Sequence, residues 1–214
     1  MLVCTGLVKS FRGPDGPVRV LAGIDLHLSA GTLACLLGPS GSGKTTLLHI
    51  AAGLLHADAG QVRVAGTDLI GLGEEARASL RRQRIGMVFQ RAHLLPYLDV
   101  LANVRLGGAT EAAAKTLLER LGLGPRLRHR PAALSAGERQ RTALARALVL
   151  GPALVLADEP TANLDQASAD SVLGELAAAA TRGAAVLIAT HDLRLAGTSS
   201  KRWRLDAGHC LDVA

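Results

Sequence analysis

The chain has 214 residues, of which 49% are hydrophobic and 2% aromatic, and its formal net charge is +6. This length fits one sizeable domain, or one domain with a small inserted lobe, and the hydrophobic fraction suffices for an aliphatic core. No run of 18 apolar residues occurs, and Met1–Ser10 lacks the pattern of a signal peptide, so no membrane-spanning helix and no secretion are predicted.

The cysteines and the positive charge narrow the class of protein further. Cys4, Cys35 and Cys210 are far apart and form no CxxC pair, which argues against a disulfide framework or a zinc site and favours a reducing, cytosolic compartment. A basic protein can bind nucleic acid or anionic lipid, but the arginines are scattered, so no nucleic-acid partner is expected. The tightest basic group is interpreted as a solvated helix face: Arg77, Arg81, Arg82 and Arg84.

The first half of the chain alternates short apolar runs with glycine-rich turns. This pattern predicts an α/β domain with a largely parallel sheet. A helix is predicted over Lys44–Ala52, where Gly53 ends it, and a break is predicted at residues 13–17. The predicted strands are Leu2–Val8, Val18–Leu21, Ile24–Leu28, Leu33–Leu37, Gln61–Val64 and Ile85–Phe89.

The second half begins with a stretch of different character, from about residue 91 to residue 150. Its periodicity is mostly helical, and we interpret it as a helical lobe inserted into the α/β core. The remaining chain returns to buried strands and predicts an edge hairpin over Arg202–Val213. The predicted helices are Thr110–Leu121, Gly137–Leu150 and Ala167–Ala180, and the predicted strands are Ala153–Ala157 and Ala184–Ala189.

Residues 38–45 match the phosphate-binding pattern G-x-x-x-x-G-K-[ST] at every fixed position. Glycines let backbone N–H groups approach phosphates, and the N-terminus of the following helix adds partial positive charge. Lys44 is expected to reach the β- and γ-phosphates, and the Thr45 hydroxyl to take a position beside Mg²⁺. A turn without a ligand is disfavoured, because a strand precedes the motif and a helix follows it. The predicted ATP site comprises Gly38, Pro39, Ser40, Gly41, Ser42, Gly43, Lys44, Thr45 and Thr46.

Two later strands end in residues suited to hydrolysis. Asp158 and Glu159 follow an apolar run, so Asp158 is expected to hold Mg²⁺ through water and Glu159 to polarise the attacking water as general base. His191 follows the last buried strand and is expected to hydrogen-bond the γ-phosphate or that water. The alternatives are a solvated strand end for the acidic pair and a structural or surface role for the histidine.

The P-loop, the acidic pair and His191, together with three further motifs, follow the chain order of the motifs of the ABC ATPase family, which they resemble. These six motifs cover nearly the whole chain. The segment Leu134–Arg141 is similar to the signature motif of that family, and Gln90 matches its Q-loop. The segment Thr161–Asp165 resembles the D-loop, directly after the acidic pair. Within the family, His93–Pro96, His129–Pro131 and Leu156–Asp165 resemble the bacterial lipoprotein-releasing and macrolide-exporter ATPases.

The resemblance implies one ABC ATPase domain over residues 1–214. Residues 1–90 and 151–214 would form a RecA-like P-loop NTPase core with an antiparallel β subdomain, and residues of about 91–150 an α-helical subdomain. Two such domains would pack head to tail around two ATP molecules, so that Ser135 and Gly137 act on the nucleotide of the other chain. Asp165 would line the interface, Gln90 would complete the Mg²⁺ shell, and Phe11 would stack on adenine unless it is an ordinary core residue.

The implied function is that of an ATPase subunit of an ABC transporter, which dimerises on ATP and drives a separate transmembrane subunit of an exporter or a lipoprotein- or peptide-handling system. Its partners would be a transmembrane permease subunit and a second ATPase subunit, in a homodimer, at the cytoplasmic face of the cell membrane. Two features depart from the family. Ala136 replaces the first glycine of the signature, where a methyl group could crowd the backbone, and the segment 103–129 is short for the helical lobe of the family. The alternatives weighed are a soluble ABC protein of DNA repair or translation and a small-molecule P-loop kinase.

Overall fold

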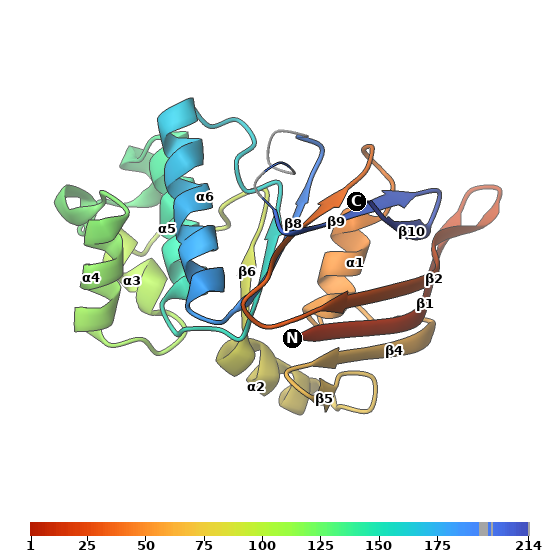
Figure 1. The fold of residues 1–214 in the computed structure, drawn as a ribbon. Helices are drawn as coiled ribbons and strands as arrows, with labels where there is room; N and C mark the ends of the chain where they lie inside the picture. The colour runs from red at the N-terminus through yellow and green to blue at the C-terminus, as the bar shows by residue number, and fades with distance from the viewer. Residues whose placement is uncertain (193–196, 198, 214) are drawn as a thin grey trace.

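The computed structural model describes residues 1–192, 197 and 199–213, which form two sheets with helices on both sides of the larger one (Figure 1). The smaller sheet is antiparallel and has the order β2-β1-β4-β5, and the larger has the order β10-β9-β3-β8-β7-β6 and is parallel except for β10. The strands are β1 (Leu2–Gly13), β2 (Gly16–Leu28), β3 (Leu33–Leu37), β4 (Ala59–Val64), β5 (Thr67–Asp68), β6 (Ile85–Val88), β7 (Leu154–Asp158), β8 (Ala185–Thr190), β9 (Lys201–Asp206) and β10 (His209–Asp212).

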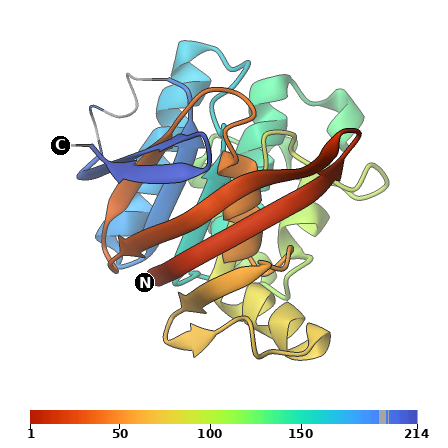
Figure 2. The ribbon, with the colours of Figure 1, turned by 90° about the vertical axis from the view of Figure 1, so that its right-hand side faces the viewer.

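The helices divide between the two faces of the larger sheet. Helix α1 lies between the two sheets, behind β1 and β2 in the side view of Figure 2, whereas α5 and α6 cover the opposite face (Figure 1). No helix in the described part of the chain has the length and apolar character that a bilayer crossing requires. The helices are α1 (Lys44–Ala51), α2 (Glu74–Arg84), α3 (Val100–Arg105), α4 (Glu111–Arg120), α5 (Ala136–Leu148) and α6 (Gln166–Thr181), with 3₁₀ turns at Gly124–Arg126 and Pro131–Ala133.

The larger sheet separates two apolar clusters, because successive side chains of a strand point to opposite faces. In β7, Leu154 and Leu156 pack with α1 and the smaller sheet. Val155 and Ala157 pack instead with the cluster that contains α3 to α6. Both faces of the parallel strands are therefore buried, which explains their continuous apolar sequence. The α/β fold with a P-loop core, an antiparallel sheet and added helices is confirmed.

The first hairpin is longer than the sequence predicts. Strand β1 continues to Gly13, and β2 is one strand where two were predicted. The ladder pairs Leu7 with Ile24 and Val8 with Ala22, so Gly23 is an extra residue between the two pairs. Gly23 has a φ of +93°, which glycine adopts without strain. The gap between the predicted strands Val18–Leu21 and Ile24–Leu28 is thus a bulge within a continuous strand.

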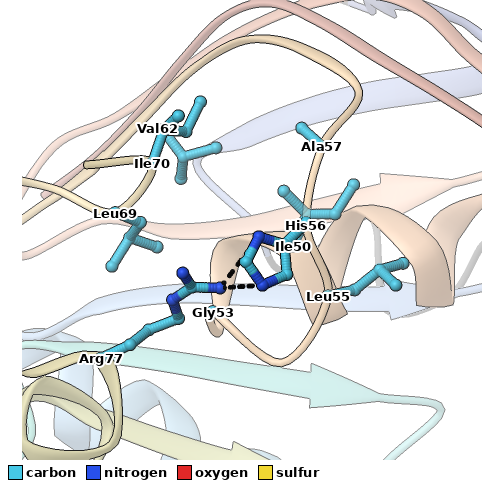
Figure 3. A pocket seen from close by; sticks show the side chains of 9 residues that line it. All are labelled: Ile50, Gly53, Leu55, His56, Ala57, Val62, Leu69, Ile70 and Arg77. Atoms are coloured by element: carbon cyan, nitrogen blue, oxygen red, sulfur yellow. Dashed lines mark hydrogen bonds between the residues drawn. The ribbon is translucent and has the colours of Figure 1, made fainter. Parts of the chain in front are cut away.

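The arginine-rich helix α2 also differs from the prediction, because Arg77 is only 4% exposed. Its Nη1 lies 2.6 Å from Nε2 of His56 (Figure 3). Its Nη2 donates to the Leu72 carbonyl at 2.7 Å. The side chain passes so close to Gly53 that a Cβ there would lie 2.9 Å from Arg77 Cγ. The interpretation as a solvated face is therefore wrong for Arg77, which lines a cavity of about 30 Å³.

The helices α3, α4 and α5 lie together on one side of the molecule (Figure 1). Leu118 of α4 and Leu144 of α5 belong to the same apolar cluster as Val155 of β7. This group of helices therefore shares its core with one face of the larger sheet. The division of the chain into a core of residues 1–90 and 151–214 and a helical subdomain of about 91–150 stays a prediction.

Candidate functional site

Four predicted motifs emerge side by side at one edge of the larger sheet. The parallel registers pair Leu37 with Thr190, Asp158 with Ala189, and Val88 with Ala157. The P-loop, His191, the acidic pair and the exposed Gln90 therefore leave neighbouring strands at the same carboxyl edge. In parallel α/β sheets this edge is where ligands bind.

The P-loop forms an open hollow of about 230 Å³ next to the N-terminus of α1, with Gly41, Gly43 and Thr46 in its wall. Lys44 is buried, and its ammonium group donates to the carbonyls of Gly38 at 2.7 Å and Pro39 at 2.9 Å. The Ser42 hydroxyl is buried without a hydrogen-bond partner among the described residues. A cation and an unsatisfied donor at a helix N-terminus suit a polyphosphate.

Two glycines of the loop are required for different reasons. A Cβ at Gly38 would lie 2.3 Å from the Leu205 carbonyl oxygen of β9 and 2.7 Å from Ser42 Oγ. Gly41 has open space around it, but its φ of +79° is one that side chains rarely adopt. The approach of β9 to Gly38 could not be inferred from the motif, because the two segments are far apart in sequence.

The predicted Mg²⁺ position is built from oxygen atoms of Thr45 and Asp158. The Thr45 hydroxyl donates to Oδ2 of the buried Asp158 at 2.7 Å. Among the described residues no group of three or more His, Cys, Asp or Glu side chains could hold a metal ion. One hydroxyl and one carboxylate fit Mg²⁺, which usually keeps several waters and binds phosphate oxygens.

Glu159 and His191, which were predicted as separate groups, are in direct contact. His191 Nδ1 lies 2.7 Å from Glu159 Oε1, which also accepts from the His191 amide at 3.1 Å. Thr190, a residue that the sequence did not single out, donates from Oγ1 to Glu159 Oε2 at 3.1 Å. The His191 side chain remains 69% exposed, so one face of the pair is open to a ligand.

The backbone of Glu159 is held in the left-handed region, with a φ of +44°. Its amide donates to the Ala189 carbonyl of β8 at 2.9 Å. A non-glycine residue in this region costs about 1–2 kcal/mol, and such residues concentrate at functional sites. The strained backbone and three hydrogen bonds together give the carboxylate one defined orientation.

The signature motif forms the start of α5. Ser135 caps this helix by accepting from the Glu138 amide at 3.1 Å, and Glu138 Oε2 accepts from the Ser135 amide at 2.8 Å, which completes a capping box. Ser135 and Ala136 are exposed. Ala136 is the first helical residue and has no positive φ, so its methyl group causes no backbone conflict within this chain.

A second network joins the signature to the D-loop. Asp165 caps α6 by accepting from the Ser168 amide and hydroxyl, both at 2.8 Å, and these bonds hold the pKa of the Asp165 carboxyl below its usual range. Arg141 of α5 donates to the same hydroxyl at 2.8 Å. The contacts described for Ser135, Gly137 and Asp165 thus lie within α5 and α6 rather than at the P-loop.

Gly137 lies where α5 packs tightly against α6, since a Cβ there would lie 2.5 Å from Ser168 Oγ. We expect Gly137→Ala to lower the free energy of unfolding by about 1–3 kcal/mol, because the crowded site has no room for a methyl group. Thermal unfolding checks this expectation. The matched control is Gly174→Ala on α6, which meets no atom within 4 Å and should raise stability by about 0.5–1 kcal/mol. Equal effects of both changes would contradict the packing argument.

Helix α5 also holds the segment on both sides of Gln90. Gln140 donates to the Phe89 carbonyl at 3.1 Å. Arg146 donates to the carbonyls of Ala92 at 2.9 Å and His93 at 2.8 Å. The helix that begins with the signature is therefore bonded to the Q-loop of its own chain, a connection that the sequence motifs did not indicate.

Phe11 lies near the end of β1, paired with Val18, and is 42% exposed. Lys9 Nζ lies 5.5 Å from the centre of its ring. The alternative that Phe11 is an ordinary core residue is therefore wrong. An exposed aromatic face suits stacking with a planar ligand.

Comparison with known proteins gives matches that agree with one another, and those to individual relatives extend over nearly the full chain. The family model described as ABC transporter matches residues 21–162. The lipoprotein-releasing system ATP-binding protein LolD of Cereibacter sphaeroides is 47% identical, with 97% of each chain covered. The protein of the same name from Alcanivorax borkumensis is 42% identical, with 94% of this chain and 92% of that one covered.

A solved structure agrees with these matches. The dimeric ATP-binding cassette MJ0796, in a post-hydrolysis state bound to ADP and Pi, is 29% identical and has a TM-score of 0.92. The comparison covers 100% of this chain and 99% of the cassette.

Proposed function

Because this chain belongs to the ABC transporter family, we propose that it is the ATP-hydrolysing subunit of a lipoprotein-releasing transporter. It binds ATP, hydrolyses it and drives a separate membrane subunit, as its family membership establishes. The observation that carries the hydrolytic role is the contact between Glu159 and His191 beside the P-loop. Lipoprotein as cargo rests on the relatives named for lipoprotein release. The kinase and DNA-repair alternatives leave those matches unexplained.

The P-loop binds the triphosphate in this proposal. Lys44 exchanges its two carbonyl partners for β- and γ-phosphate oxygens, and Ser42 gains a partner for its buried hydroxyl. Thr45, Asp158 and Gln90 would hold Mg²⁺, which neutralises charge on the β- and γ-phosphate oxygens when it is bound. Phe11 supplies the stacking surface for adenine.

Hydrolysis requires a water that is positioned and deprotonated as it attacks the γ-phosphorus. A carboxylate oxygen of Glu159 accepts the proton, the water oxygen forms the new P–O bond, and ADP leaves with the electrons of the broken bond. His191 and Thr190 orient the carboxylate through the contacts described above. The exposed imidazole is free to hydrogen-bond the γ-phosphate.

Two copies of the chain would form the working unit. In this arrangement the exposed Ser135 and the amide of Gly137 face the γ-phosphate held by the P-loop of the second copy, and Asp165 lies at the interface. The dimeric form of the structurally similar cassette supports this arrangement. The dimer would associate with its permease at the cytoplasmic face of the cell membrane, as a peripheral subunit.

The proposed cargo is tested with the membrane chain that co-purifies with this protein, reconstituted together in proteoliposomes. We expect ATP to release a lipid-modified protein into the soluble fraction, because the motor converts hydrolysis into movement of the permease. The same protein without its lipid serves as control, and transport assays report both. Stimulation of ATPase activity by another class of substrate, without lipoprotein release, would overturn the assignment of the cargo.

A further inference from the structure

We propose that Arg126 is a positioning residue for the nucleotide of the second copy, because it holds and neutralises Glu138 at the start of the signature helix. Arg126 Nε donates to Glu138 Oε1 at 2.8 Å, while Oε2 of the same carboxylate accepts from the Ser135 amide at 2.8 Å. One carboxylate thus connects a guanidinium to the cap of α5. The inference rests on the proposed function, since it requires the signature to face ATP bound by another copy.

The arginine comes from a well-anchored part of the helical region. It ends the 3₁₀ turn Gly124–Arg126, and the chain that follows is fixed to α3. The Leu101 amide donates to the Leu127 carbonyl at 3.0 Å, and the Val100 amide to the His129 carbonyl at 2.9 Å. Arg126 therefore reaches Glu138 from a defined position, 12 residues before it in sequence.

Glu138 places a negative charge beside the surface that would meet a γ-phosphate. Bonds from the Ser135 amide and from Arg126 hold the pKa of its carboxyl below the usual range, so it is ionised at neutral pH. Ser135 and Ala136, which flank this charge, are exposed. An uncompensated carboxylate at this place would repel an incoming triphosphate. The neighbouring Arg139 directs its guanidinium to the Leu134 carbonyl, so Arg126 supplies the compensating charge.

A purely structural role for the ion pair makes a different prediction. A partly exposed pair contributes little to folding, and losing either partner would break the same contact, so adding Glu138→Gln would not restore what Arg126→Ala removes. In contrast, neutralisation predicts that Arg126→Ala becomes harmless once Glu138 is also neutral. Glutamine at the third position of the helix can complete a capping box as glutamate does, so Glu138→Gln removes the charge and keeps the cap.

The test measures the Mg-ATP concentration for half-maximal dimerisation of the full chain by light scattering, in a Glu159→Gln background. Arg126→Ala is expected to raise this concentration by about tenfold, or ~1.4 kcal/mol. Adding Glu138→Gln should bring it back to within about twofold, and Arg126→Lys should retain most of the affinity. The effect of Arg126→Ala should shrink in high salt, because ions screen the exposed charge.

Two controls separate this role from general damage. Arg128→Ala removes the same charge from the same segment, but Arg128 is 78% exposed and pairs with Asp99 at 3.5 Å, so it should have no effect. Binding of a fluorescent ATP analogue to the monomer should be unchanged by Arg126→Ala, because that nucleotide occupies the chain's own P-loop. Loss of monomer binding, or no rescue by Glu138→Gln, would overturn the inference. Absence of ATP-driven dimerisation before Arg126 is changed would instead refute the proposed dimer mechanism.

Discussion

Replacing Glu159 with glutamine is expected to lower the ATP turnover number by about 10²–10⁴-fold, the usual contribution of a general base. The amide has nearly the shape of the carboxylate and can still accept from Thr190 through its oxygen. It cannot take the proton of the attacking water, so chemistry is lost while the loop that binds the phosphates remains. ATP binding should therefore change little, and the bound dimer should persist.

Phosphate release measured with the membrane subunits present gives the turnover number, and size-exclusion chromatography with Mg-ATP reports the dimer. Glu75→Gln makes the same chemical change on the exposed face of α2 and should leave both results unaltered. Turnover like that of the unaltered protein in Glu159→Gln would remove Glu159 from its assigned role. Loss of ATP binding would show that the change had damaged the site rather than the chemical step.

Lys44→Met is expected to weaken ATP binding by at least about 100-fold, because it removes the ammonium group that we propose bonds the phosphates. Hydrogen bonds to charged groups contribute about 1.5–3 kcal/mol each, and one or two such bonds account for this loss. The methionine side chain is similar in length to the buried hydrocarbon stem of Lys44, so the packing of α1 should be preserved. The carbonyls of Gly38 and Pro39, which accept from Lys44, would need water as a replacement partner.

Isothermal titration with Mg-ATP measures the affinity, and thermal unfolding without nucleotide shows whether the fold is preserved. Lys115→Met is the matched control, because Lys115 is partly exposed on α4 and pairs with Glu111 at 2.7 Å, away from the P-loop. Equal affinities of the unaltered chain and Lys44→Met would mean that the loop amides alone hold the triphosphate.

The local motifs are predictable because each depends on residues close together in sequence. A short stretch of sequence is enough to recognise each of these features: the glycines around Lys44, the apolar strand before Asp158 and the capping residues of α5. The same reasoning failed at Arg77, because helical spacing does not reveal which side of a helix another segment covers. It also divided β2 at Gly23, since a bulge and a chain break look alike in sequence.

The sequence by itself determined the alternation of strands and helices in the α/β core, the glycine-rich P-loop motif and the resemblance to the family, because these depend on local patterns of residue type. Only the tertiary structure decided which functional groups meet: Glu159 with His191, 32 residues later, and Arg141 with Ser168, 27 residues later. The physical reason is that such contacts depend on the register of neighbouring strands and on the closeness of packed helices. A change at Gly137 or Arg126 is therefore expected to have effects that the motifs alone do not predict.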